Sequence, residues 1–276
     1  MPELPEVETV RRTLAPILGA RLTSVSASGL PLRLGAKVPV AGLRKLVGCK
    51  VVALRRLGKY LLLDVEGDKG ILVHLGMSGR LRVFDAGEAT ALHTHLRLGL
   101  EAGRELRYSD PRRFGQISLY QRGREREHPA LAVLGPDPLD ESLDGAALLL
   151  AQARRRKTPL KAFVLDQRVL AGMGNIYASE ALWLARLRPT LSASRLTART
   201  AAGLWRAIRQ VLEHALTHGG TTLRDFVAAD GSTGEHAGYL QVYGRDATPC
   251  PRCRTDIRRL VQQGRATYFC PTCQPP

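Results

Sequence analysis

The chain has 276 residues, of which 44% are hydrophobic, and its 41 lysines and arginines outnumber its 25 aspartates and glutamates to give a formal net charge of +16. This length predicts two domains, and no uninterrupted apolar stretch reaches the roughly 18 residues that would cross a bilayer, which excludes a membrane-spanning protein. The charge, carried mainly by arginine, favours nucleic acid as a partner, although a basic solubilising surface would give the same excess.

The chain begins MPELPEVETV, which has three glutamates and lacks the basic and apolar segments of a secretory signal or transit peptide. We therefore expect a protein of the reducing cytoplasm. Apolar residues at helical spacing predict a helix over residues 6–18. Pro5 suits the first helical position, and Glu6 would lie near the positive end of the helix dipole.

Short runs rich in valine, leucine and isoleucine follow, and they are separated by glycine, aspartate or lysine turns. Such runs predict β-strands, here over residues 50–55, 60–65, 71–75, 95–100 and 116–120. A series of strands of this kind indicates an antiparallel sandwich or barrel.

Long apolar periodicity then replaces the alternating pattern, which predicts helices. We expect them over residues 143–153, 159–167, 176–185 and 197–217. The fold class is therefore α+β: an antiparallel β-sandwich with an N-terminal helix, then a helical domain that ends in a small β-hairpin. The expected boundaries are 1–130 for the sandwich domain, 131–142 for a linker with charged residues, glycine and prolines, 143–240 for the helical domain and 241–276 for the hairpin.

Four of the five cysteines form two C-x2-C pairs with sixteen residues between them, namely Cys250, Cys253, Cys270 and Cys273. Two such turns supply the four thiolates of a tetrahedral zinc site, whereas a disulfide or redox pair is disfavoured in a reducing cytoplasm. Four protein ligands leave no position for water, so we expect one structural Zn²⁺ and chemistry elsewhere. Cys49 has no partner of matching spacing, and we expect a small buried side chain.

Between the cysteine pairs, the sequence IRRLVQQGRATYF predicts two strands joined at Gln263 and Gly264. Arg265 would then lie beside the turn of a zinc-stabilised hairpin, where it could enter a DNA groove or bind a phosphate. The alternative is an ordinary solvated arginine.

The first residues have no nucleophile unless Met1 is removed. Pro2 would then carry a secondary amine able to attack an aldehyde-like carbon and form an iminium intermediate. N-terminal amines titrate near about 7.7–8.0, so part of this amine would be nucleophilic at neutral pH. Glu3 and Glu6 are close enough in sequence to transfer protons to and from a reacting sugar, although they could also merely cap the helix.

Three motifs stand together in this chain: PELPEVE at the start, GMGNIYASE in the helical half and the terminal C-x2-C-x16-C-x2-C. With GKYLLLD, VHLGMSGRL, YSDPRRFG, TTLRDF and QVYGR in the same order, they resemble the formamidopyrimidine-DNA glycosylases over essentially the whole chain. The resemblance implies a monomeric enzyme of base excision repair that excises oxidised purines from duplex DNA and cleaves abasic sites by β,δ-elimination. It also implies a β-sandwich, a helix-two-turn-helix domain and a zinc finger.

Catalytic roles follow from the same resemblance. It implies that Pro2 is the nucleophile at C1′, Glu3 the general acid and base, and Glu6 a supporting proton relay. Lys59 matches a family lysine that approaches the lesion and its phosphate. Arg265 matches the arginine of the zinc finger that binds the phosphates around the extruded nucleotide.

DNA contacts are implied as well. Extruding a base leaves a gap in the stack, and Met77, Arg112 and Phe114 match the family residues that fill it. For Met77 and Phe114 the alternative is core packing. His93 matches a position that contacts phosphate or supports the site, as does His74, which we expect to be structural. Lys161 matches a lysine near the DNA.

The GMGN sequence at a predicted helix start exposes backbone amides to a phosphate, and Asn175 would serve there as cap and donor. The alternative is a plain turn between helices.

One segment departs from the family pattern. Many relatives have Gly-Lys-Pro-Gly-Tyr-Phe where residues 231–240 read GSTGEHAGYL. Because this loop is associated with recognition of the extruded base, the preference between 8-oxoguanine and formamidopyrimidines stays open. Two alternatives also remain: an endonuclease VIII-like enzyme for oxidised pyrimidines, against which Phe114 argues, and a non-catalytic zinc-ribbon protein that would not need a free N-terminus.

Overall fold

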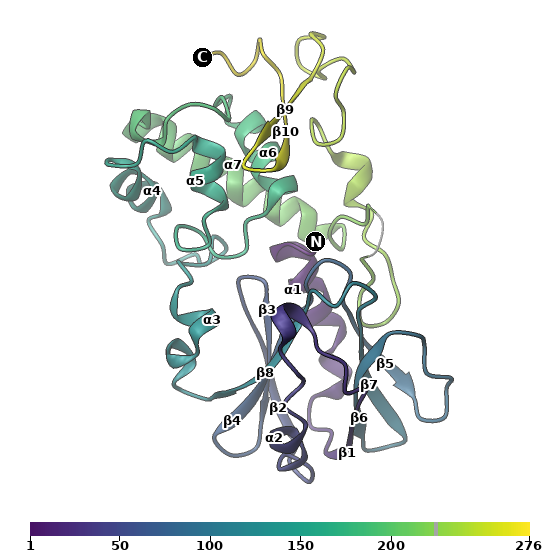
Figure 1. Ribbon diagram of the computed structural model, residues 1–276. Coiled ribbons are helices and arrows are strands. Elements are labelled where there is room, and N and C mark those ends of the chain that lie inside the picture. Colours follow the sequence, from purple (N-terminus) through teal and green to yellow (C-terminus); the bar gives the residue numbers. More distant parts are fainter. Residues whose placement is uncertain (224–225) are drawn as a thin grey trace. The chain divides into compact units, whose positions relative to one another are not determined.

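The computed structural model describes residues 1–223 and 226–276, so two residues of the TTLRDF motif, Arg224 and Asp225, lie outside the described residues. The described chain forms two compact units (Figure 1). Unit 1 consists of Met1–Val133 with His218–Ala237, and unit 2 of Leu134–Thr217 with Gly238–Pro276. The segment 218–237 thus packs with the strands, although it follows the helices in sequence. The four expected domain boundaries stay a prediction.

The N-terminal helix α1 spans Leu4–Thr13. It begins at a capping box, in which Glu3 and Glu6 each accept a hydrogen bond from the backbone of the other. The predicted end at residue 18 is wrong, because the last part forms a separate 3-10 turn, η1 at Ala15–Ile17. Pro16 lies in this turn and cannot donate the backbone hydrogen bond that would continue the helix.

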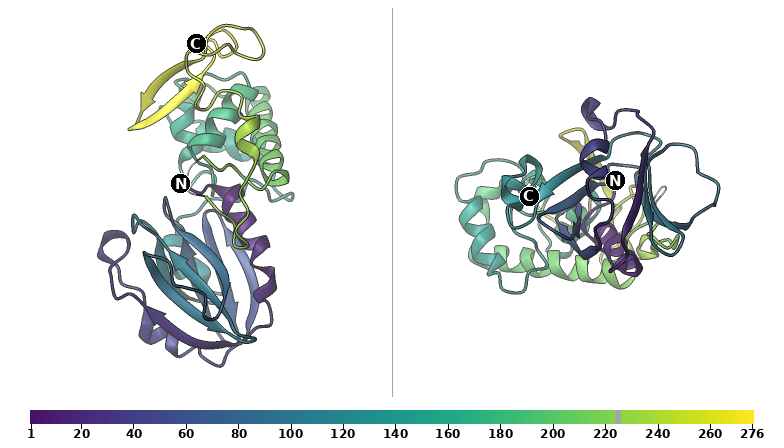
Figure 2. Two further views of the ribbon diagram at one scale, coloured as in Figure 1. Left: turned by 90° about the vertical axis from the view of Figure 1, so that its right-hand side faces the viewer. Right: turned by 90° about the horizontal axis from the view of Figure 1, so that it is seen from below.

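Unit 1 contains two antiparallel four-stranded sheets, which confirms the predicted sandwich (Figures 1 and 2). One sheet has the order β1-β6-β7-β5, with bounds Leu22–Ala27, Thr94–Leu100, Arg104–Ser109 and Arg80–Asp85. The other has the order β2-β3-β4-β8, with bounds Val51–Leu57, Tyr60–Val65, Lys69–His74 and Gln116–Gln121. Apolar residues of α1 and of both sheets form one core.

The five predicted strands are confirmed with ends within two residues, but β1, β5 and β7 were not predicted. The strands β5 and β7 are rich in arginine, which masks their alternation. In β7, Glu105 neutralises part of this positive charge. Its carboxylate forms ion pairs with Arg97 of the neighbouring β6 over 2.6 Å and with Arg107 of its own strand over 2.7 Å. The two arginines face each other in neighbouring strands, so the ion pairs need the sheet that they stabilise.

The four predicted helices of unit 2 are confirmed with ends within two residues. They are α4 at Gly145–Ala153, α5 at Leu160–Leu165, α6 at Asn175–Leu184 and α7 at Ala198–Thr217. The C-terminal hairpin pairs β9, Arg258–Gln262, with β10, Arg265–Phe269. Short elements that the sequence did not predict are α2 at Val40–Arg44, α3 at Pro129–Ala132, and the 3-10 turns η2 at Arg33–Gly35, η3 at Glu125–Glu127, η4 at Ala193–Arg195 and η5 at His236–Tyr239.

Within residues 1–223 and 226–276, no helix is both long enough and apolar enough to span a bilayer.

Candidate functional site

Pro2, Glu3 and Glu6 lie together at the start of α1, and all three are buried. The backbone N–H of Glu3 donates to Oε2 of Glu6 over 2.7 Å. The hydrogen bonds of Glu3 and Glu6 therefore confirm that both acids cap the helix. It does not exclude proton transfer, because a buried carboxylate so close to the N-terminus is also well placed to act as a base.

Glu6 makes a second contact that a simple cap would not need. Its Oε1 accepts the backbone N–H of Thr221 over 2.7 Å, so both carboxylate oxygens are held by backbone donors. Gly220 allows this approach, because a Cβ at that residue would lie 2.9 Å from Oε1 of Glu6. Thr221 was not singled out from the sequence, since its contact with Glu6 depends on chain packing alone.

Lys59 lies in the β2–β3 turn, and its side chain is largely buried beside His74 at the end of β4. Burial, together with the positive charges of Lys59 and Arg33, lowers the pKa of His74 to about 4. The N–H of Gly76 donates to Nδ1 of His74 over 3.1 Å, which leaves the proton of the neutral ring on Nε2. His74 is thus an uncharged residue that supports the turn before Met77.

Met77 and Phe114 are exposed at 38% and 44%, so neither packs in the core as the alternative interpretation required. They lie in two separate loops, after β4 and before β8. The guanidinium of Arg112 stacks over the ring of Phe114 with 4.8 Å to its centroid. This pair presents an apolar surface and a positive charge in one place, which suits contact with bases and phosphates.

A fully buried carboxylate, Asp110, joins these two loops. Its Oδ1 accepts the hydroxyl of Ser78 over 2.6 Å and the N–H of Arg112 over 3.2 Å. Its Oδ2 accepts the N–H of Gly115 over 2.8 Å and the hydroxyl of Tyr108 over 3.1 Å. Asp110 was not singled out from the sequence, although an aspartate that directly precedes a proline in a turn is a signal for such loop-organising bonds.

His93 belongs to the same assembly through its backbone. It is exposed, has a left-handed φ of 64°, and its carbonyl accepts the N–H of Asp110 over 3.0 Å. His95, buried two residues later, contacts the carbonyl oxygen of Asp110 through Nε2 over 3.0 Å. Asp110 therefore brings together the segments that carry four of the predicted residues: Met77, His93, Arg112 and Phe114.

In unit 2, Lys161, Asn175 and Arg265 meet at β10. The amine of Lys161 donates to the carbonyl oxygen of Ala266 and to Oγ1 of Thr267, both over 2.9 Å, and the side chain is only 1% exposed. Nδ2 of Asn175 donates to the same carbonyl oxygen over 3.0 Å. The expected capping role of Asn175 is wrong, because Gly174 occupies the N-cap position of α6.

Arg265 is exposed and is the first residue of β10. The two preceding residues, Gln263 and Gly264, have left-handed φ angles of 49° and 72°, as a tight two-residue hairpin turn requires. The predicted position of Arg265 beside the turn is therefore confirmed. Its backbone is held in place by the bonds that the next residue, Ala266, receives.

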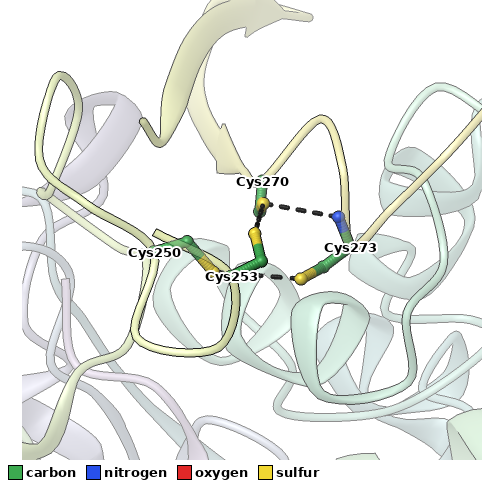
Figure 3. Close-up of side chains that lie close together, drawn as sticks. All are labelled: Cys250, Cys253, Cys270 and Cys273. Atoms are coloured by element: carbon green, nitrogen blue, oxygen red, sulfur yellow. Dashed lines mark hydrogen bonds between the residues drawn. The ribbon is translucent and has the colours of Figure 1, made fainter. Parts of the chain in front are cut away.

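The four cysteines of the C-x2-C pairs converge in Figure 3, and their sulfur atoms lie within 4.8 Å of one another. The sulfurs of Cys250 and Cys273 are 3.9 Å apart, and those of Cys253 and Cys270 are 3.4 Å apart. A tetrahedron with Zn–S bonds of about 2.3 Å has edges of about 3.8 Å, so the donor set fits zinc. Burial and the neighbouring thiols raise the pKa of Cys273 to about 12, and a divalent cation would offset this effect.

Cys49 lies outside this cluster, in unit 1, where it is partly buried against the core of the sandwich. The expectation of a buried side chain is therefore met only in part, because Cys49 packs against the core at its edge.

Glu180, near the end of α6, anchors the start of the zinc-binding segment. Its buried carboxylate accepts the N–H groups of Gln241, Val242 and Tyr243 over 2.9, 3.0 and 2.8 Å. Burial raises the pKa of Glu180, and the three donors oppose this by stabilising the anion. The sequence contains Glu180 as the last residue of the GMGNIYASE motif, but no local pattern predicts its contact with residues 241–243.

Three family models match the chain. The formamidopyrimidine-DNA glycosylase N-terminal domain matches residues 1–117, the H2TH domain of the same glycosylases matches residues 134–227, and a zinc finger found in FPG and IleRS matches residues 248–276.

A formamidopyrimidine-DNA glycosylase from Cereibacter sphaeroides is 45% identical over 284 residues, covering 99% of this chain and 100% of the relative. Among solved structures, a Lactococcus lactis FPG variant bound to DNA containing Fapy-dG has a TM-score of 0.91 and 34% identity, with both chains covered completely. MutM (FPG) from Thermus thermophilus has a TM-score of 0.88 and 43% identity, with 99% and 98% covered. The Lactococcus lactis protein was also solved with DNA containing an abasic site or an oxidised pyrimidine.

Asp110→Asn should destabilise the protein by about 2–3 kcal/mol, because an amide nitrogen would face a buried donor in place of an acceptor. Ser78→Ala, which removes only one of the four donors, should cost about 1 kcal/mol. Urea unfolding measures both changes. Asp85→Asn, at an exposed position on β5, is the control, and equal stability of Asp110→Asn and this control would contradict the role assigned to Asp110.

Zinc content should depend on the cluster and not on Cys49. The purified protein should contain one zinc per chain by atomic absorption, and Cys270→Ser should lose it, whereas Cys49→Ser should keep it. In Cys270→Ser, backbone amides of residues 241–276 should lose protection from hydrogen exchange while those of β3 and β4 keep theirs. Full zinc content in Cys270→Ser would show that these four thiols are not the ligand set.

Proposed function

Because the chain belongs to the formamidopyrimidine-DNA glycosylase family, we propose that Pro2, Glu3 and Glu6 carry out its reaction on oxidised purines in duplex DNA. The protein is a DNA glycosylase and abasic-site lyase of base excision repair. A non-catalytic zinc-ribbon protein is therefore excluded. The observation that carries the proposal is the buried N-terminus of α1, where Pro2 and the N-cap Glu3 directly precede the first turn that contains Glu6.

The mechanism requires protein from which Met1 has already been removed, because the peptide bond to Met1 would occupy the amine of Pro2; Met1 is exposed, whereas Pro2 is buried. The freed amine of Pro2 attacks C1′ of the damaged nucleotide, and the bond between C1′ and the base breaks with its electron pair leaving on the base. A proton delivered through Glu3 neutralises the departing base. The amine then loses its proton, and its lone pair forms a double bond to C1′ while the C1′–O4′ bond breaks with its electron pair on O4′. O4′ takes up a proton, and the product is an iminium linked to Pro2.

Strand cleavage follows from the iminium, which acidifies the protons at C2′. Removal of a C2′ proton expels the 3′ phosphate, a second elimination expels the 5′ phosphate, and water releases the remaining sugar fragment from Pro2. Glu3 serves as the base and Glu6 relays protons to and from it. The carboxylate of Glu6 can do this from a fixed position, because its two oxygens are held by Glu3 and Thr221.

We assign the DNA contacts to the residues that the two units present. Met77, Arg112 and Phe114 fill the gap left by the extruded nucleotide, and their exposure supports this role. Lys59 and His93 approach the phosphates around it. Zinc, when bound to the four cysteines, holds the hairpin in shape and takes no part in the chemistry.

Arg265 contacts the phosphates directly, and its exposure beside the hairpin turn supports that contact. Half-buried Asn175 lies at the edge of this phosphate-binding surface, whereas Lys161 is almost completely buried and supports it from within, because the bonds of both residues to Ala266 hold β10 in place.

The substrate class has one competing candidate. The Lactococcus lactis relative was solved with an oxidised pyrimidine in its DNA, which favours testing oxidised pyrimidines beside 8-oxoguanine and formamidopyrimidines. We assign oxidised purines as the main substrate and a monomer as the active form. A cytoplasmic location agrees with the zinc-binding thiols, which a reducing compartment keeps available.

Borohydride should trap a covalent complex between the protein and a duplex with 8-oxoguanine opposite cytosine, because it reduces the iminium at Pro2. Protein that keeps Met1, or whose N-terminus is acetylated, should form no adduct yet still bind a duplex with an uncleavable abasic-site analogue. Intact mass spectrometry identifies the form present. An adduct that persists with a blocked N-terminus would contradict the mechanism.

Arg265→Ala should lower the affinity for DNA of any sequence and reduce the slope of log K against log salt by about one charge. Arg258→Ala is the matched control, since Arg258 is also exposed but pairs with Phe269 at the opposite end of the hairpin. Fluorescence anisotropy across a salt series measures both. An unchanged slope for Arg265→Ala would remove Arg265 from the phosphate contacts.

A further inference from the structure

The position of the Glu6 carboxylate depends on one peptide group that lies far along the chain. This is the peptide between Gly220 and Thr221, whose N–H donates to Oε1 of Glu6 over 2.7 Å. Glu6 and Thr221 are both almost completely buried, so water cannot replace this donor without opening the segment. Whatever holds the peptide therefore also holds Glu6.

His236 contacts this peptide directly at one point and the side chain of Thr221 at another. Its backbone N–H donates to the carbonyl oxygen of Gly220 over 3.1 Å, at the opposite end of the same peptide plane. Its Nδ1 lies 3.1 Å from the hydroxyl oxygen of Thr221. His236 is buried as well, and hydrogen bonds in series through one peptide strengthen each other. The N–H that binds Glu6 is thus both oriented and polarised by His236.

Close packing leaves the peptide no room to move. Gly220 has a left-handed φ of 84°, and a Cβ there would lie within 3.3 Å of three atoms of Glu6. On the other side, a Cβ at Gly234 would lie 2.2 Å from the carbonyl oxygen of Gly220. Two segments, 219–221 and 234–236, are therefore in direct backbone contact beside Glu6. A change at His236 is transmitted to the carboxylate because neither segment can shift to absorb it.

We propose that His236 is a positioning residue for the reaction, acting through Thr221 to fix the orientation of Glu6. This inference rests on the proposed role of Glu6 and extends it to the segment 231–240, where the sequence departs from the family pattern. It gives this segment a function other than base recognition. A residue that reads the base affects only base excision, whereas a residue that positions Glu6 affects excision and abasic-site cleavage together.

Two variants interrupt the link at different atoms. His236→Phe removes Nδ1 but keeps a ring of similar size beside His218, whose ring centroid is 6.2 Å away. Thr221→Val removes the hydroxyl but keeps the N–H that binds Glu6. Thr222→Val is the matched control, because Thr222 directly follows the first segment and its hydroxyl accepts the N–H of Gly234 in the second, without a bond to Glu6.

Single-turnover rates are measured on a duplex with 8-oxoguanine and on a duplex with an abasic site. His236→Phe and Thr221→Val should slow both reactions about fivefold, the factor that one hydrogen bond contributes, with unchanged Kd for DNA. Thr222→Val should react at the normal rate, and Thr221→Ser should recover the rate lost in Thr221→Val. A loss confined to 8-oxoguanine excision, or an unchanged rate in both variants, would overturn the proposal.

A double variant with Glu6→Gln tests the role of His236 separately from the role of Glu6. If His236 acts through Glu6, His236→Phe should slow the Glu6→Gln enzyme no further. A full additional fivefold loss in that background would overturn the inference about His236 while leaving the role of Glu6 intact. A normal rate for Glu6→Gln alone would instead contradict the proposed function of Glu6. Hydrogen exchange of the Thr221 amide checks the link without catalysis, and His236→Phe should reduce its protection even where rates are too slow to measure.

Discussion

The buried carboxylate of Glu6 is the contact on which the N-terminal site depends. It joins the first turn of α1 to Thr221, 215 residues later, and so brings the segment 218–237 back to the sandwich. Two further bonds continue this attachment, from the N–H of Ala229 to the hydroxyl of Thr13 and from the N–H of Val83 to the carbonyl of Ala229. The position of the Glu6 carboxylate therefore depends on contacts between the two parts of the chain that make up unit 1.

The same device recurs at Asp110 and Glu180. Each is a buried acid that gathers donors from an irregular segment: Asp110 from the turns around Met77 and Arg112, and Glu180 from residues 241–243. A carboxylate without such donors would be costly to bury, so the loops that supply them are held in one conformation. This explains how the protein can place exposed residues such as Met77 and Phe114 on loops and still keep those loops in one conformation.

Most of the regular structure could be predicted from the sequence, since apolar spacing is a local property. The strands β5 and β7 could not, because arginines hide their alternation; in β7, Glu105 pairs with Arg107 of the same strand and with Arg97 of the neighbouring β6, a contact that forms only in the sheet. The start of α6 was predicted within one residue, yet the cap was assigned to Asn175 instead of Gly174. The predicted capping role of Asn175 is wrong because its side chain donates a hydrogen bond to Ala266, on a hairpin that is distant in sequence.

The sequence by itself determined the four cysteine ligands that fit zinc and placed Pro2, Glu3 and Glu6, the residues proposed to react, next to one another at the N-terminus. The spacing of Cys250 and Cys253, repeated at Cys270 and Cys273, fixes the geometry of each pair within a single turn, and Pro2 and Glu3 directly precede the helix whose first turn contains Glu6. The tertiary structure decided which residues lie against these parts of the chain. Thr221 contacts Glu6, His236 contacts Thr221, and Asp110 holds the loops of Met77 and Phe114, all through contacts between separate segments. Such contacts follow from packing and burial, which no local spacing records.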